Sequence, residues 1–153
     1  MSEIQTVSAL DAHLGYWLRM VSNAVSQSFA RALDGEGVTV AEWVLLRTLH
    51  DAAETSPSRV AATLGMTKGA ITKLADRLID KGLIRRKADP ADGRAQLLAL
   101  TPRARKLVPK LAALADANDG TFFSGLKPAE RAELERLLMK IIADRGITEI
   151  PAS

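Results

Sequence analysis

The chain has 153 residues, of which 47% are hydrophobic, 4% are aromatic and none is cysteine. This composition predicts one ordinary folded domain with an aliphatic core, and it excludes disulfides, thiolate metal sites and cysteine-based redox sensing. The net charge of +3 conceals a basic centre, because residues 59–110 carry 13 Lys and Arg against 4 Asp and Glu, a pattern typical of a polyanion-binding site or of a solvated basic face.

The N-terminal segment begins without a targeting signal and then predicts one long helix. It lacks a basic region followed by an apolar run, and no stretch of about 18 apolar residues occurs in the chain, so we expect a cytoplasmic protein with no membrane partner. Apolar side chains recur at three- and four-residue spacings from Leu10 to Leu33, which indicates an amphipathic helix. We expect it to end at residues 34–37, where Gly35 and Gly37 can supply left-handed backbone.

Two shorter helices are predicted next, and both have clear start signals. Thr39 and Glu42 have the spacing of a capping box, in which each side chain satisfies a backbone amide at the helix start. Ser56 can cap the following helix, and Pro57 suits its first position because that amide has no helical partner.

A fourth helix is predicted almost immediately, over residues 67–81. Gly65 can end the preceding helix in a tight turn, Thr67 is a good N-cap, and Gly82 is a C-terminal stop. The third and fourth helices are therefore expected to form a helix-turn-helix pair.

A change of period then predicts a β-hairpin. Residues 83–87 and 96–100 are typical of two short strands, and residues 88–94 between them are rich in turn-forming residues. We expect a hairpin with a long tip.

Two helices are expected to complete the chain. Thr101 and Pro102 repeat the cap-and-proline start, and the pattern continues to Asp119 and Gly120, with residues 121–126 left open between continuation and a break. A last helix is predicted from Pro128 to Gly146, with an inward-facing stripe formed by Leu134, Leu137, Leu138, Ile141 and Ile142.

The outward face of the fourth helix has the chemistry of a DNA-reading surface. The second helix of such a pair can enter the major groove, which is wide enough to admit it. Lys and Arg can then meet phosphates or base acceptors, and short threonines permit close approach; the alternative is a plain solvated helix face. The candidate DNA-binding residues on this helix are Thr67, Lys68, Thr72, Lys73 and Arg77.

The predicted hairpin is the second candidate DNA-binding element. Arg94 lies at its tip, where an arginine can enter a narrow minor groove. Asp92 can hold the guanidinium of Arg94 by a charge-assisted hydrogen bond, and Asp89 can stiffen the other side of the tip. Arg85 and Arg86 are expected along the first strand, directed toward phosphates.

These motifs resemble the MarR family of bacterial transcriptional regulators. The similarity extends in order and spacing over nearly the whole chain, through residues 39–43 (TVAEW), 64–67 (LGMT), 71–78 (ITKLADRL), 81–84 (KGLI), 89–94 (DPADGR) and 98–101 (LALT). Some members sense peroxides through a cysteine, which this chain lacks.

The resemblance implies a mainly α fold with a small β-hairpin wing, that is, a winged helix-turn-helix with N- and C-terminal dimerisation helices. Residues 1–153 would form one regulator domain, in which residues 8–34 and 102–153 dimerise and residues 38–101 form the DNA-binding core, with a recognition helix at 67–81 and a wing at 83–101. It also implies a homodimer on a pseudo-palindromic double-stranded DNA operator, released by a small aromatic carboxylate or phenol.

A candidate effector site is expected between the dimerisation helices and the DNA-binding core. Aromatic walls and one cation would suit a small aromatic acid, because ligand pockets are mostly apolar with a few placed polar groups. Side chains of these types are more often core, filler or interface residues than parts of a ligand pocket. The candidate residues are His13, Tyr16, Trp17, Met20, Trp43 and Arg47.

No enzyme, cofactor or metal site is indicated. His13 and His50 are not spaced as metal ligands, and the chain contains no nucleophile motif, phosphate-binding loop or dinucleotide fingerprint. The favoured hypothesis is a dimeric, sequence-specific transcriptional repressor released by a ligand. The alternatives are a ligand-independent counter-silencer or architectural factor, and a protein–protein adaptor built on the same scaffold.

Overall fold

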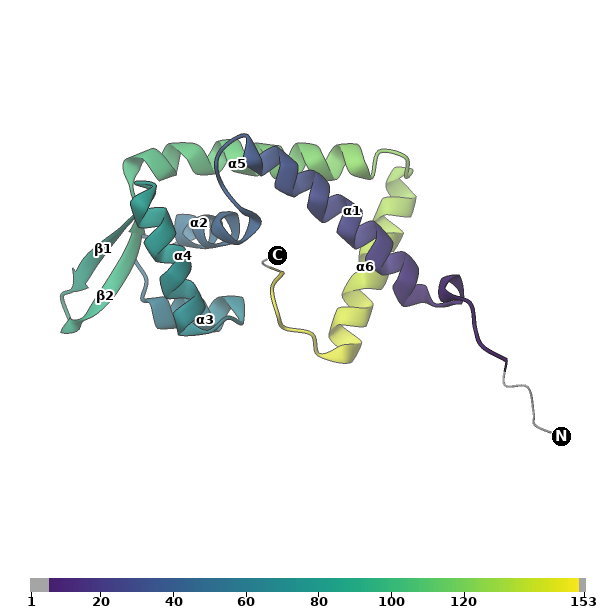
Figure 1. Cartoon of the computed structure of the whole chain (residues 1–153), viewed down its shortest axis with the longest axis horizontal. Coiled ribbons are helices and arrows are strands. Elements are labelled where there is room, and N and C mark those ends of the chain that lie inside the picture. The colour runs from purple at the N-terminus through teal and green to yellow at the C-terminus, as the bar shows by residue number, and fades with distance from the viewer. Residues whose placement is uncertain (1–5, 152–153) are drawn as a thin grey trace.

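Helices dominate the structure, a computed structural model that describes residues 6–151. A 3₁₀ turn (Leu10–Ala12) precedes four helices, namely α1 (Leu14–Asp34), α2 (Val40–Asp51), α3 (Pro57–Leu64) and α4 (Lys68–Asp80). Strands β1 (Ile84–Asp89) and β2 (Asp92–Leu100) form a hairpin, followed by α5 (Pro102–Phe122) and α6 (Pro128–Arg145) (Figure 1). The predicted fold class, mainly α with a β-hairpin wing, is confirmed.

The predicted starts of α2, α3 and α5 are confirmed in detail. The amide of Glu42 donates to Thr39 Oγ1 at 3.1 Å, and the amide of Thr39 donates to Glu42 Oε1 at 3.3 Å, which completes the capping box of α2. Ser56 accepts from the amide of Arg59 at the start of α3, and Thr101 accepts from the amide of Ala104 at the start of α5. Local side-chain capping therefore sets the beginnings of these helices.

The predicted ends of the first helix need correction. The α-helix starts at Leu14 instead of Leu10, because His13 has extended backbone (φ −102°, ψ 126°) and separates α1 from the 3₁₀ turn. At the other end Gly35 is still right-handed, with φ −62°, so only Gly37 of the two glycines supplies left-handed backbone, with φ +71°.

Helix α5 passes through Gly120 and ends at Phe122, which resolves the question left open by the sequence. Contacts with α1 hold its last turns. Ser28 Oγ donates to Asn118 Oδ1 at 2.6 Å, and Asn118 Nδ2 donates to the carbonyl of Val25 at 3.4 Å. Packing of this kind outweighs the low helix propensity of a single glycine.

The hairpin has longer strands and a shorter tip than predicted. Ile84 pairs with Leu100 and Ala88 pairs with Gln96, but the next pair is Asp89 with Asp92, so the register shifts and β2 bulges. Asp89 Oδ1 accepts from the amide of Ala91 at 2.9 Å and stabilises a tight turn. The expected long tip is therefore wrong, because this side-chain hydrogen bond lets the ladder extend into it.

The core lies where α2, α3, α4, the hairpin base and the first half of α5 meet. Thr55 forms an isolated β-bridge with β2, because its amide donates to Leu98 O at 3.1 Å and its carbonyl accepts from Leu98 N at 2.8 Å. The largest fully buried apolar side chains are Leu33, Leu45, Leu46, Leu49, Val60, Ile71, Leu78, Leu98, Leu100, Val108 and Leu111. This core gives α4 and the hairpin a rigid base.

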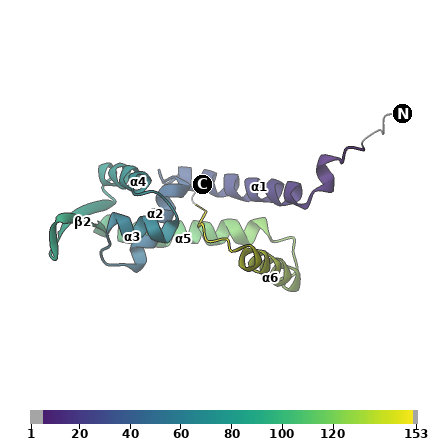
Figure 2. The ribbon, with the colours of Figure 1, turned by 90° about the horizontal axis from the view of Figure 1, so that it is seen from below.

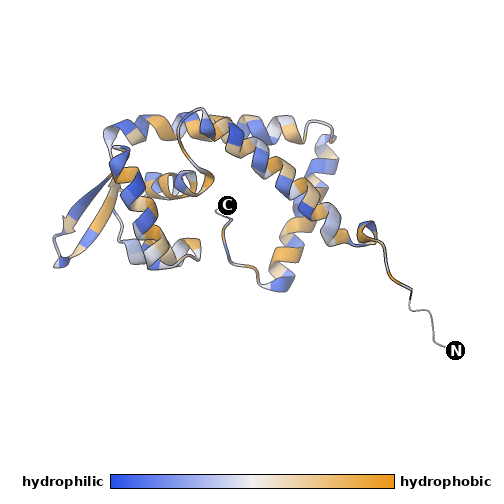
Figure 3. Ribbon diagram, in the orientation of Figure 1, coloured by the Kyte–Doolittle hydropathy of each residue, from blue (hydrophilic) through white to orange (hydrophobic). Residues whose placement is uncertain are grey.

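Helices α1 and α6 extend away from that core. Figure 2 shows α1 running beside α5 and α6 leaving from the far end of α5, and both helices carry alternating apolar and polar segments in Figure 3. The predicted inward stripe of α6 faces solvent in the single chain, with Leu137 42% and Ile142 46% exposed, so its expected burial is wrong for one chain alone. None of the described helices combines the length and apolar character that a membrane crossing requires.

Candidate DNA-binding surface

Helix α4 presents a basic face because its two ends and its apolar stripe determine its orientation. Gly65 turns the chain out of α3 with φ +64°, and Thr67 Oγ1 accepts from the amide of Ala70 at 3.1 Å to cap α4. The stripe toward the core consists of Ile71, Leu74, Ala75 and Leu78, all buried. The opposite face is consequently directed at solvent.

All five residues of this segment that were predicted to contact DNA are exposed: Thr67, Lys68, Thr72, Lys73 and Arg77. The hydroxyl of Thr72 donates to the carbonyl of Lys68 at 2.9 Å, so its proton is used inside the helix while its oxygen can still accept. Lys68, Lys73 and Arg77 form no ion pair within residues 6–151, which leaves their charges available to a polyanion.

The wing carries the exposed side chain of Arg94 near its tip. The predicted role of Asp92 needs correction, because Asp92 Oδ1 accepts from the backbone amide of Arg94 at 3.1 Å instead of holding its guanidinium. This contact orders the backbone of the bulge and leaves the guanidinium unpaired within the described part of the chain. Asp89 stiffens the other side of the tip, as predicted.

The two arginines of β1 differ. Arg85 is exposed and forms no ion pair among the described residues. Arg86 forms an ion pair with Asp76, which lies on the outward face of α4. The sequence predicted Arg86 as a phosphate contact, whereas here its guanidinium joins the hairpin to α4.

A groove connects α4, α3 and the wing. It has a volume of about 330 Å³, and its lining includes the polar side chains of Ser56, Ser58, Lys68, Thr72, Arg86 and Arg94. The structure thus gathers candidate residues from two separate sequence segments onto one cationic, concave surface.

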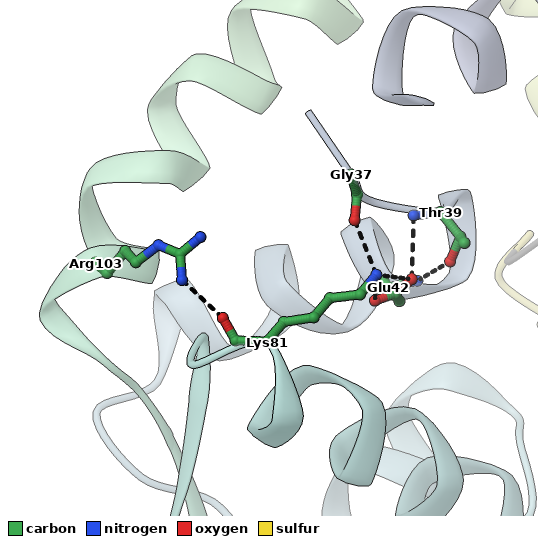
Figure 4. A network of polar contacts seen from close by, with 5 residues as sticks. All are labelled: Gly37, Thr39, Glu42, Lys81 and Arg103. Carbon is green, nitrogen blue, oxygen red and sulfur yellow. Dashed lines mark hydrogen bonds and ion pairs between the residues drawn. The ribbon is translucent and has the colours of Figure 1, made fainter. Parts of the chain in front are cut away.

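The C-terminal end of α4 is held by a polar junction that sequence reasoning missed (Figure 4). Lys81 Nζ lies 2.8 Å from Glu42 Oε2 and 2.8 Å from the carbonyl of Gly37, while Arg103 donates to the carbonyl of Lys81 at 2.8 Å. Glu42 was predicted only as a cap, and no local pattern joins residues 39 positions apart.

Glu42 remains ionised in this junction although it is only 1% exposed. Burial alone would raise its pKa, but hydrogen bonds from Lys81 and Thr39 outweigh burial, so the pKa of Glu42 lies below its ordinary value. The ion pair is thus formed at neutral pH.

The candidate effector residues form two separate groups in one chain. His13 precedes α1, whereas Tyr16, Trp17 and Met20 lie exposed on its N-terminal half, with Tyr16 and Trp17 in edge-to-face contact at 5.2 Å. Trp43 packs edge-to-face on Phe29, with ring centroids 6.4 Å apart. Met20 and Phe29 are nine positions apart on α1, which corresponds to about 13.5 Å along the helix. Arg47 pairs with Asp51 at 2.6 Å.

Comparison with known sequences finds a family match in the part of the chain that contains α4 and most of the hairpin. A profile described as the MarR family matches residues 36–95. The chain is 31% identical over 134 residues to the HTH-type transcriptional repressor Rv2887 of Mycobacterium tuberculosis. The alignment covers 88% of this chain and 96% of that protein.

Solved structures resemble the fold over most of its length. Mutant MarR from E. coli complexed with operator DNA has a TM-score of 0.76 and 28% identity, covering 84% of this chain and 93% of that chain. BpsR from Bordetella bronchiseptica, whose DNA binding is described as regulated by 6-hydroxynicotinic acid, has a TM-score of 0.77 and 28% identity, covering 89% and 97%.

Proposed function

The chain belongs to the MarR family of DNA-binding transcriptional regulators, and we propose that it acts as a homodimeric repressor on a pseudo-palindromic operator. The observation that carries this proposal is the cationic surface formed by α4 and the wing, on which the charges of Lys68, Lys73, Arg77 and Arg94 are unpaired within residues 6–151. Membership makes the chain a regulator and not an enzyme. The repressor name of the mycobacterial relative supports the sign of regulation.

On this proposal the residues divide the work of recognition. Helix α4 enters the major groove with Thr67, Lys68, Thr72, Lys73 and Arg77, while Arg94 reads the width of a neighbouring minor groove. Arg85 contacts phosphate, and Asp92 acts indirectly by ordering the backbone of the wing. Arg86 contacts DNA only if it is released from Asp76.

The proposed domain organisation follows the same division. Residues 38–101 form the DNA-binding core, with the recognition helix at 67–81 and the wing at 83–101, and residues 8–34 and 102–153 form the dimerisation helices. Support comes from the exposed apolar stripes of α1 and α6, since an apolar surface of this extent is typical of an interface.

A measurement of DNA affinity tests the assignment of the wing. Arg94→Ala should weaken binding to a duplex that the wild-type chain selects from a randomised library, at least several-fold at physiological salt. Arg136→Ala is the matched control, because Arg136 lies on α6 and pairs with Glu133. Equal affinity of the Arg94 variant, with the dimer intact, would contradict the role of the wing.

We further propose that a small aromatic acid or phenol releases the repressor. The description of BpsR supports this class of effector. The candidate site comprises His13, Tyr16, Trp17, Met20, Trp43 and Arg47, and its two groups are far enough apart on one chain that the partner protomer would have to complete the pocket.

The two tryptophans make the effector site testable by fluorescence. Titration with 6-hydroxynicotinate or p-coumarate should quench the tryptophan fluorescence of the wild-type protein. The variants Trp17→Phe and Trp43→Phe would show which of the two tryptophans reports the ligand. No change in fluorescence or in DNA affinity with such acids would favour a ligand-independent counter-silencer or architectural factor.

A further inference from the structure

The recognition helix ends at a residue that is hydrogen-bonded on two sides. Lys81 is the C-cap of α4, and its ammonium group contacts three oxygens, namely the carbonyl of Gly37 at 2.8 Å and the two carboxylate oxygens of Glu42 at 2.8 and 3.0 Å. An ammonium group has three protons, so these three acceptors saturate it. A half-exposed lysine, which is ordinarily mobile, is thereby held in one position.

The backbone around the same residue is attached to the start of α5. Arg103 Nη1 donates to the carbonyl of Lys81 at 2.8 Å, and Thr101 Oγ1 donates to the carbonyl of Gly82 at 2.8 Å. The amide of Thr101 also donates to the carbonyl of Leu83 at 3.1 Å. These bonds lock the first turn of α5 onto the turn that follows α4.

The loop after α1 and the start of α5 therefore both contact the C-terminal end of α4 at Lys81 (Figure 4). Gly37 belongs to the loop that follows α1, whereas Arg103 belongs to α5. We propose that Lys81, Glu42 and Arg103 are positioning residues that fix the angle of α4 on the dimer and so determine the half-site spacing of the operator. This inference rests on the proposed function, because it requires a dimer on paired half-sites.

Simple geometry shows why a small change at this junction matters. Helix α4 has 13 residues and is therefore about 20 Å long. A tilt of about 10° around its C-terminal end moves its N-terminal end by about 3.4 Å, which is the rise of one base pair. Loosening the junction should thus blur the spacing preference by one base pair while leaving the contacts of each half-site unchanged.

Selection of binding sites from a randomised duplex library tests the proposal. The principal variant is Arg103→Ala, because Arg103 is exposed and its loss removes its hydrogen bond to the carbonyl of Lys81 while the bonds of Thr101 to this turn remain. Arg105→Ala is the matched control, since Arg105 is an exposed arginine of the same helix and its side chain forms no ion pair among the described residues. Arg103→Lys retains a donor and should restore part of the preference. The double variant Glu42→Gln/Lys81→Met removes the contacts of the Lys81 ammonium group with Gly37 and Glu42 without leaving an unpaired buried charge.

The readout is the distribution of half-site spacings among the selected sequences. Wild type and Arg105→Ala should prefer one spacing over spacings one base pair longer or shorter by about tenfold, and Arg103→Ala and the double variant should reduce this ratio to about threefold or less with the same half-site sequence. A uniform loss of affinity with an unchanged spacing ratio would overturn the proposal and leave the junction a purely structural role. If wild type selected no paired half-sites, the proposed dimeric repressor itself would be wrong.

Discussion

Glu42 is the most deeply buried charged side chain of residues 6–151, and its contribution to stability depends on pH. The pKa of Glu42 is lowered in the folded state, so the unfolded chain binds a proton at this carboxylate more readily than the folded protein does. That stabilisation is complete above the ordinary glutamate pKa of about 4.3 and is lost as the pH falls through the lower folded-state pKa.

Replacement of Glu42 by Gln should therefore destabilise the protein in a pH-dependent way. The free energy of unfolding at pH 7 should fall by about 1–2 kcal/mol, because Lys81 loses a charge-assisted partner and Gln accepts less strongly. The difference between variant and wild type should shrink as the pH is lowered below about 4. Chemical denaturation at pH 7, 5 and 3.5 measures this, and a difference that stayed constant with pH would contradict the ion pair.

Asp76 places a negative charge on the exposed face of α4 that we propose to contact DNA. Its ion pair holds Arg86 away from other partners, although both side chains remain partly exposed. The substitution Asp76→Asn should release Arg86, strengthen binding to a random duplex several-fold and steepen the slope of log K against log salt by up to about 0.9. Fluorescence anisotropy over a range of KCl concentrations checks this, and weaker binding to the random duplex would show that Asp76 instead aims Arg86 at a phosphate.

Single residues were predictable from the sequence only where their partners are local. The capping box of Thr39 and Glu42 spans three positions and was correctly predicted, and so was the stiffening role of Asp89 at the wing tip, although its partner there was not. The pairs Glu42 with Lys81 and Asp76 with Arg86 join different elements. No periodicity encodes such pairs, because they depend on how the elements pack.

At the scale of elements, the turn between α3 and α4 requires left-handed backbone at one residue. Gly65 has φ +64°, and a Cβ there would meet only ordinary contacts at 3.7 Å, so the obstacle to a side chain is backbone strain and not space. Gly69 lies within α4 in open space and has no positive φ.

These two glycines should respond to alanine in opposite directions. Gly65→Ala should lower the free energy of unfolding by about 1 kcal/mol, because an L side chain disfavours left-handed backbone. Gly69→Ala should raise it by about 0.5 kcal/mol through better helix propensity. Urea titration of both variants beside wild type tests the pair. If Gly65→Ala had the same free energy of unfolding as wild type, the expected backbone strain at residue 65 would be contradicted.

Element identities were more predictable than their ends. Capping residues and apolar periodicity located every helix from α1 to α6 and both strands, because each of these signals is local. The wing tip and the end of α5 were not predictable in the same way. A bulge in β2 and the contacts of Asn118 with α1 determine them, and neither is visible as a sequence pattern.

At the scale of the whole molecule, the single chain leaves the apolar stripe of α6 uncovered. Leu134, Leu137, Leu138, Ile141 and Ile142 are between 36% and 46% exposed. The proposed dimer would cover these side chains, which explains why helical periodicity in the sequence suggested burial that one copy alone does not provide.

Charges placed on this stripe should separate the protomers. The variant Leu137→Asp/Ile141→Asp should sediment as a monomer and bind the selected duplex about 100-fold more weakly, because the second half-site contact is no longer intramolecular. Met139→Asp is the matched control, since Met139 is 61% exposed and lies off the stripe of α6. A dimeric double variant would place the interface elsewhere.

Hydroxyl-radical footprinting of the wild-type protein on its selected duplex tests the central claim most directly, because it maps which backbone positions two recognition helices and two wings cover. We predict two-fold symmetric protection, with two segments centred about one helical turn apart and further protection by the wings on both flanks. Arg94→Ala should remove the flanking protection and leave the two central segments protected. A single, asymmetric footprint, or none at low salt, would contradict a dimer that reads DNA through α4 and the wing.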